Sequence, residues 1–114
     1  MAIPDLRTLA LSLPEAYEEL TWGDHPTFRV RKKIFAILSA DEKSVRLKAD
    51  MATQKALIAT DSDTYFVPSH VGRHGWIGAQ IADVPQDELI ELLAEAWRLA
   101  APKKLVKAFD ESAI

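Results

Sequence analysis

The fold is decided by residues 27–48, which read TFRVRKKIFAILSADEKSVRLK. Apolar and polar side chains alternate over 28–31 and again over 44–48, whereas 34–38 is an unbroken apolar run. Alternation is typical of a strand with one solvated face, and a short apolar run is typical of a strand covered on both faces. The stretch therefore predicts an antiparallel meander with 34–38 as its central strand and polar turns at Lys32-Lys33 and at 41–43.

Positive charge is concentrated in and just after this meander. The chain of 114 residues has a net charge of −3, yet residues 29–55 alone carry eight basic and three acidic side chains. The segments before and after are each net −4. Six cations of the meander are the nucleic-acid-binding candidates: Arg29, Arg31, Lys32, Lys33, Arg46 and Lys48.

Two interpretations of these cations stand open. Arg29 and Arg31 are expected on one face of their strand, and Arg46 and Lys48 on one face of theirs, with apolar side chains of 34–38 between them. Such a surface suits a nucleic-acid backbone and its bases. Alternatively, the basic residues protect strand edges from pairing with other chains, as they do in many natural sheets.

The rest of the chain completes a single α+β domain over residues 1–114. A helix is expected from Pro4 and stops before Pro14, and 15–22 is either a strand or an extended lead-in. Asp50 is a suitable N-cap for the next helix. A brief strand is expected at 65–67, and a final strand at 76–81 is expected to close the antiparallel sheet. The expected helices pack on this sheet and span 4–13, 51–60, 85–100 and 103–109.

No catalytic or metal constellation is visible, and we expect a protein that is not an enzyme and has no cofactor. The chain has no cysteine, which excludes thiolate chemistry. His70 and His74 are four residues apart but in a glycine-containing loop, so a metal site needs His25 or a distant carboxylate as well. Ser69 beside His70 does not make a nucleophilic triad. Residues 61–64 contain two aspartates of a calcium-loop pattern but lack its glycine and final glutamate, and we interpret them as a turn.

The loop after the brief strand offers a second candidate site at Arg73, His74 and Trp76. An arginine beside an indole can hold a planar anion or a stacked base. The same residues also suit a loop that is pinned to the sheet, with Trp76 buried and Arg73 paired with an acid. No apolar run approaches the length of a membrane span and no leader pattern is visible, so we expect a cytoplasmic monomer without membrane contact.

The chain resembles the MmcQ/YjbR-like family of small bacterial proteins. The resemblance is carried by motifs spread over nearly the whole chain, and their order and spacing make it specific. The matching motifs are Leu13-Pro14-Glu15, Trp22-Gly23, Phe28-Arg29-Val30, Lys33-Ile34-Phe35-Ala36, Leu47-Lys48, Arg73-His74-Gly75-Trp76 and Ala101-Pro102-Lys103-Lys104.

The resemblance implies an α+β domain without established enzymatic activity or cofactor, and a role in DNA binding through a double wing of β-hairpins. One wing corresponds here to the hairpin around Arg29, Arg31, Lys32 and Lys33. Members often have glycine in that turn where this chain has Arg31-Lys32, which leaves the turn type open.

Our leading hypothesis is therefore a non-enzymatic DNA-binding protein. The alternative is a small-molecule or protein-interaction module centred on Arg73, His74 and Trp76, with Trp22 as a further ligand-binding candidate.

Overall fold

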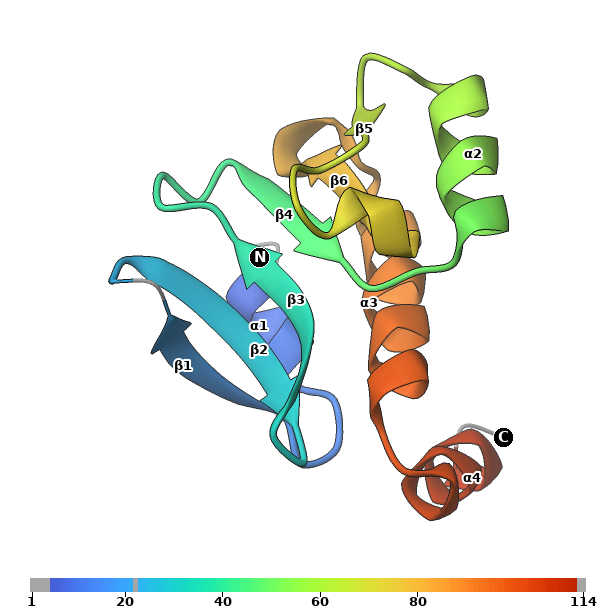
Figure 1. The fold of residues 1–114 in the computed structure, drawn as a ribbon. Helices are drawn as coiled ribbons and strands as arrows, with labels where there is room; N and C mark the ends of the chain where they lie inside the picture. The colour runs from blue at the N-terminus through green and yellow to red at the C-terminus, as the bar shows by residue number, and fades with distance from the viewer. Residues whose placement is uncertain (1–4, 22, 113–114) are drawn as a thin grey trace.

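A computed structural model describes residues 5–21 and 23–112. It contains six strands: β1 (Tyr17–Thr21), β2 (His25–Val30), β3 (Lys33–Leu38), β4 (Ser44–Leu47), β5 (Tyr65–Phe66) and β6 (Ile77–Gln80). They form one antiparallel sheet in the order β1-β2-β3-β4-β6-β5 (Figure 1). The predicted α+β class and antiparallel meander are confirmed.

The predicted central strand is covered on both faces. Phe35, Ala36, Ile37 and Leu38 of β3 are all buried. Alternate side chains of β3 point to opposite faces, so burial of all four requires material on each side of the sheet. The prediction of a strand covered on both faces, made from the apolar run, is therefore correct.

Four α-helices and two 3-10 turns accompany the sheet. The elements are α1 (Leu6–Leu11), α2 (Met51–Thr60), η1 (Gly72–His74), η2 (Ile81–Asp83), α3 (Gln86–Ala100) and α4 (Lys103–Ser112). Asp50 caps α2 as expected, because its carboxylate accepts a hydrogen bond of 2.7 Å from the backbone N–H of Thr53. In the described ranges, none of the helices has the length and apolar character that a bilayer crossing requires.

The hydrophobic core lies on one face of the sheet, beneath α1 and α3. Leu6 and Ala10 of α1 and Leu93 of α3 join the inward side chains of the strands in one buried cluster. Figure 1 shows both helices behind the sheet, whereas α2 lies beside the β5–β6 end. Only part of the predicted helical layer therefore covers the sheet face directly.

The structure decides one strand assignment that the sequence left open and corrects another. The segment that was either a strand or an extended lead-in is β1, and it pairs with β2 at the edge of the sheet. The final strand, β6, is an inner strand, because the two-residue β5 pairs on its outer side. A strand of two residues carries too little pattern to predict its position in a sheet.

The β2–β3 turn is at Arg31-Lys32 and not at Lys32-Lys33, since Lys33 already belongs to β3. Arg31 and Lys32 have φ values of 49° and 71°. Positive φ at both central residues is typical of the type I′ turn, which matches the twist of a hairpin but favours asparagine and glycine. The turn thus has hairpin geometry without glycine, and its two L-residues occupy a costly left-handed conformation.

We expect Lys32→Gly to raise the free energy of unfolding. The left-handed conformation costs an L-residue about 1–2 kcal/mol, and the greater backbone freedom of unfolded glycine offsets about 0.5–1 kcal/mol of the relief. The net gain, about 0.5–1 kcal/mol, is measurable by urea denaturation. Lys33→Gly removes the same charge from a strand position and is expected to destabilise; equal effects of the two variants would contradict the turn geometry.

Candidate functional site

The sheet has an open face, by which we mean the side turned away from α1 and α3. Thr27, Ile37, Arg46 and Gly78 are successive cross-strand neighbours there, as the strand register shows. In Figure 1 the segment with η1 lies in front of the β6 end of the sheet while α3 lies behind it. A basic side chain of the meander can contact a partner on this side only if it lies on the open face and has no acidic neighbour.

Arg29 lies on the open face, but its charge is matched by an acid. Its Nε lies 3.0 Å from a carboxylate oxygen of Glu19 and 3.2 Å from the Thr27 hydroxyl oxygen. Its Nη2 donates to the Thr21 hydroxyl at 2.9 Å. Because β1 pairs with β2, the acidic N-terminal segment delivers Glu19 beside this arginine. Arg29 is therefore held within the sheet by three neighbours instead of being free for a partner.

Arg31 is also paired, and it does not share a strand face with Arg29 as predicted, because it occupies the turn. Its guanidinium makes two hydrogen bonds to Glu15, of which Nη2 to Oε2 measures 2.9 Å. These bonds lower the pKa of the Glu15 carboxyl and raise that of the Arg31 guanidinium. Both groups therefore stay charged and compensate one another at neutral pH.

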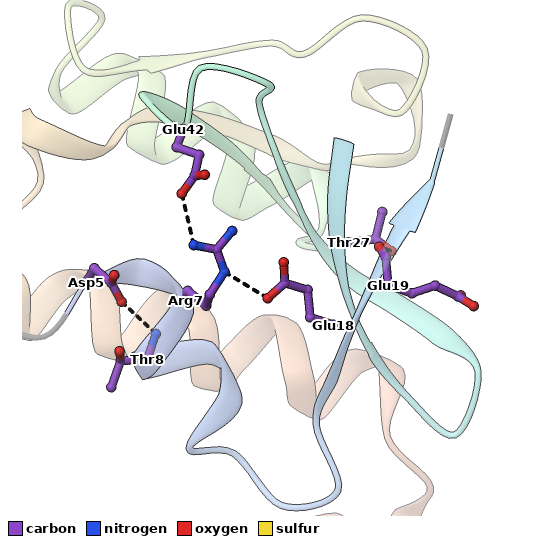
Figure 2. Close-up of polar contacts among 7 residues, drawn as sticks. All are labelled: Asp5, Arg7, Thr8, Glu18, Glu19, Thr27 and Glu42. Carbon is purple, nitrogen blue, oxygen red and sulfur yellow. Dashed lines mark hydrogen bonds and ion pairs between the residues drawn. The ribbon is translucent and has the colours of Figure 1, made fainter. Parts of the chain in front are cut away.

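The acids of β1 are divided between the two faces of the sheet. Figure 2 shows Glu18 pointing to Arg7 on α1, whereas the next residue, Glu19, points away from it. Arg7 lies 2.8 Å from Glu18 and 3.1 Å from Glu42 of the β3–β4 turn. The N-terminal segment thus uses its negative charge to hold α1 on one face and to compensate Arg29 on the other.

The lysines of the meander keep their charges uncompensated. Within the described part of the chain, no carboxylate lies within 4 Å of Lys32, Lys33 or Lys48. The backbone N–H of Lys48 donates to Phe35 O at 3.0 Å, which places Lys48 near the start of β3 and the β2–β3 turn. Three lysines therefore gather at one end of the sheet.

The Arg73, His74 and Trp76 trio does not form one open site. Trp76 is only 8% exposed, and the Lys48 ammonium lies 5.6 Å from the centre of its ring. Arg73 and His74 are exposed on η1, where Arg73 Nε lies 3.3 Å from His74 Nε2. The pinning interpretation thus holds for Trp76, but the expected acid partner of Arg73 is absent from the described residues.

Pinning of the loop depends on a glutamine that sequence reasoning did not select. The buried side chain of Gln54 on α2 donates from Nε2 to Gly72 O at 2.8 Å and to Trp76 O at 2.6 Å. A buried amide with two backbone acceptors fixes the position of the segment that carries them. A lone glutamine in a short helix gives no sequence signal for this role.

The histidines are not brought together as metal ligands. Over 5–21 and 23–112, no group of three His, Asp or Glu side chains has metal-binding geometry. His25 and His70 line the same pocket, together with Arg46, but His74 does not. Asp61 accepts hydrogen bonds from Asp63 and Thr64, which is the turn predicted in place of a calcium loop. Trp22 lies outside the described residues.

Comparisons with known proteins agree with the resemblance seen in the sequence. Residues 11–99 match the model of the protein family described as YjbR. Uncharacterized protein Rv2570 of Mycobacterium tuberculosis and uncharacterized protein Mb2600 of Mycobacterium bovis are each 37% identical over 71 residues. These matches cover 62% of this chain and 54% of each relative, so the chain spans about half the length of the curated relatives it matches.

A solved structure shares the fold. The crystal structure of Deinococcus radiodurans protein DR2400, with the family-model domain DUF419, has a TM-score of 0.77 to this structure. The likeness covers 94% of this chain and 83% of that chain at 22% sequence identity. At this identity the comparison supports the architecture and not a shared site.

Proposed function

The chain belongs to the YjbR family, and from that premise we propose that it is a non-enzymatic cytoplasmic protein that binds DNA through the β2–β3 end of its sheet. The observation that carries the proposal is the group of three uncompensated lysines, Lys32, Lys33 and Lys48, at that end. Lys32 and Lys33 have no carboxylate to displace before they neutralise phosphates. Lys48 has no carboxylate partner either, although its ammonium lies 5.6 Å from the centre of the Trp76 ring. The role in DNA binding that the family resemblance implies is the reason for proposing DNA as the anion.

The residues proposed to contact DNA differ from the arginines expected from the sequence. Arg29 and Arg31 must give up Glu19 and Glu15 before they can meet a phosphate. The β3–β4 turn is at the opposite end of the meander (Figure 1) and carries Asp41 and Glu42. We therefore propose contact through a single hairpin end, with the wing arginines acting as its structural support.

A contact of three lysines on an otherwise acidic protein has a definite electrostatic signature. The slope of log K against log salt is about −0.9 per phosphate neutralised, so three contacts give about −2.7. The net charge of −3 opposes any wider contact with the duplex. We expect weak binding without base specificity that is lost quickly as salt rises.

The test is fluorescence anisotropy with labelled duplex DNA at several salt concentrations. The variant K32E/K33E/K48E is expected to weaken binding at least about tenfold at low salt and to remove most of the slope. K103E/K104E/K107E makes the same change of charge at exposed positions of α4 and is the matched control. Equal losses in both variants, or an unchanged slope in the first, would reject the hairpin end as the DNA contact.

A small-molecule site is also a candidate function, but the structure favours a different position for it from the one expected at Arg73, His74 and Trp76. The buried Trp76 ring cannot accept a stacked ligand in this conformation. Arg46, one of the six meander candidates, instead borders a pocket with two of the histidines. A small-molecule function is thus better supported on the open face than on η1.

A further inference from the structure

A pocket on the open face joins residues from four separate segments. It has a volume of about 520 Å³ and is lined by His25, Ile37, Arg46, Ser69, His70 and Val71. This volume lies within the range of small-molecule sites, about 300–1,000 Å³. Ile37 forms an apolar floor; it is 3% exposed yet is not part of the main core cluster.

Arg46 gives the pocket an uncompensated positive charge. Its side chain is half-buried, and within the described residues it has neither a carboxylate within 4 Å nor a hydrogen-bond partner. In contrast, Arg7, Arg29, Arg31 and Arg98 are all bound to carboxylates. A half-buried guanidinium without a counter-ion offers its forked donors to an anion that enters the pocket.

His25 adds an incomplete polar contact on the β2 side. Its Nδ1 atom lies 3.0 Å from a carboxylate oxygen of Asp24, but the geometry is not that of a hydrogen bond. Nδ1 is therefore buried without a hydrogen-bond partner. A buried polar atom without a hydrogen-bond partner is uncommon in a protein interior. This one belongs to a residue that lines the same pocket as the unpaired Arg46.

The third side of the pocket is a short, well-held loop. His70 has a φ of 66°, a left-handed conformation that is unfavourable for its side chain. The loop is fixed by hydrogen bonds from Val71 N to Ser69 O at 2.7 Å and from Gly72 N to Pro68 O at 3.0 Å. The strained residue is thus part of a preformed structure that presents a hydroxyl and an imidazole at the rim.

We propose that this pocket binds a small organic phosphate, with Arg46 as the main contact of the phosphate group. Donors stand on three sides: Arg46 on β4, His25 on β2, and Ser69 with His70 on the loop. This arrangement suits the tetrahedral oxygens of a phosphate better than a planar carboxylate. The remaining volume and the apolar Ile37 and Val71 accommodate an uncharged organic part. The site does not use Lys32, Lys33 or Lys48 and is independent of DNA binding.

The smaller cleft around Arg7, with a volume of about 270 Å³, makes a useful contrast. It is lined by residues of α1, the β3–β4 turn and the start of α3. Its arginine is bound to Glu18 and Glu42, so its charge is already compensated. That cleft therefore offers an anion no uncompensated positive charge.

The test is titration of the isotope-labelled full chain with AMP, glycerol 3-phosphate, inorganic phosphate, adenosine and acetate, followed by amide chemical shifts. AMP and glycerol 3-phosphate are expected to shift the amides of Arg46 and of residues 69–71, with inorganic phosphate weaker and adenosine and acetate silent. No shift at these amides with either phosphate ester at millimolar concentration would overturn the proposal, as would equal binding of AMP and adenosine.

A charge-removing variant locates the contact. Arg46→Gln is expected to weaken AMP binding at least tenfold, whereas Arg73→Gln, which alters an exposed arginine outside the pocket, is expected to bind normally. If Arg46→Gln does not fold, the exposed double variant Ser69→Ala/His70→Gln takes its place, with a loss of at least threefold expected. Unchanged AMP affinity in the folded variant would reject the site. K32E/K33E/K48E is expected to bind AMP normally, which separates this site from the DNA contact.

Discussion

Replacement of Trp97 with alanine is expected to lower the free energy of unfolding by about 3–5 kcal/mol. The indole is fully buried at the centre of the core. Its Nε1 donates to Pro14 O at 3.0 Å, and its ring centre lies 4.9 Å from that of Phe109. One side chain thus joins α3 to the segment after α1 and to α4. Because domains of this kind are stable by about 5–15 kcal/mol in total, the loss is a large part of the whole.

Urea denaturation followed by circular dichroism measures this loss. Trp97→Phe keeps an aromatic ring but loses the indole N–H, which leaves Pro14 O without this donor; we expect a smaller cost of about 1–2 kcal/mol. The difference between the two variants separates the packing of the ring from its hydrogen bond. A cost below about 1 kcal/mol for Trp97→Ala would show that α3 does not anchor the core through this residue.

The elements that could be predicted from the sequence are those whose signals are local. The apolar run of β3 needs only its own five side chains to indicate a strand covered on both faces. In the same way, Asp50 followed by helix-forming residues marks the start of α2, and the stripe through Leu89 and Leu93 marks the buried face of α3. Each of these signals depends on residues that are close together in the sequence. It can therefore be recognised without knowing the tertiary contacts.

The basic face could not be predicted, because compensation of charge is a tertiary property. Arg29 and Glu19 are ten positions apart and meet only because β1 pairs with β2 in one register. The register between β2 and β3 shifts between Phe28 and Arg29, where a residue of β3 is left without a partner. A one-residue change of this kind places Arg31 in the turn beside Glu15. Charge that is segregated along the sequence is therefore partly neutralised in space.

The pocket was hidden for a related reason. His25, Arg46 and His70 come from β2, β4 and a loop, and no fixed spacing connects them. They meet because β4 pairs with β6 and the preceding loop then crosses the open face. The only sequence signal for this loop was the pair of glycines that flank Arg73-His74. Glycines at such positions indicate a tight turn or a close approach to other backbone.

The second large effect is expected at Gly75, which is the point where that loop meets α2. Gly75 has a φ of +94°, and a Cβ atom there would lie 2.7 Å from both Asp50 C and Met51 N. Alanine therefore meets two penalties, the left-handed conformation and overlap with backbone atoms that cannot rotate away. We expect Gly75→Ala to lower the free energy of unfolding by about 2–4 kcal/mol.

Gly23→Ala is the matched control for this variant, measured by the same urea denaturation. Gly23 has a φ of +85°, but nothing lies within 4 Å of its would-be Cβ, so only the conformational cost of about 1–2 kcal/mol applies. If the two variants lose equal stability, the close approach of Gly75 to α2 is not a constraint.

Gly75→Ala also connects the fold to the phosphate pocket. Relief of the overlap must move η1 away from α2, which weakens the hydrogen bonds from Gln54 to Gly72 and Trp76. Residues 69–71 precede this anchor directly, so we expect weaker AMP binding although no lining residue has changed. Normal AMP affinity in a folded Gly75→Ala variant would mean that the loop is held by its own turns and not by α2.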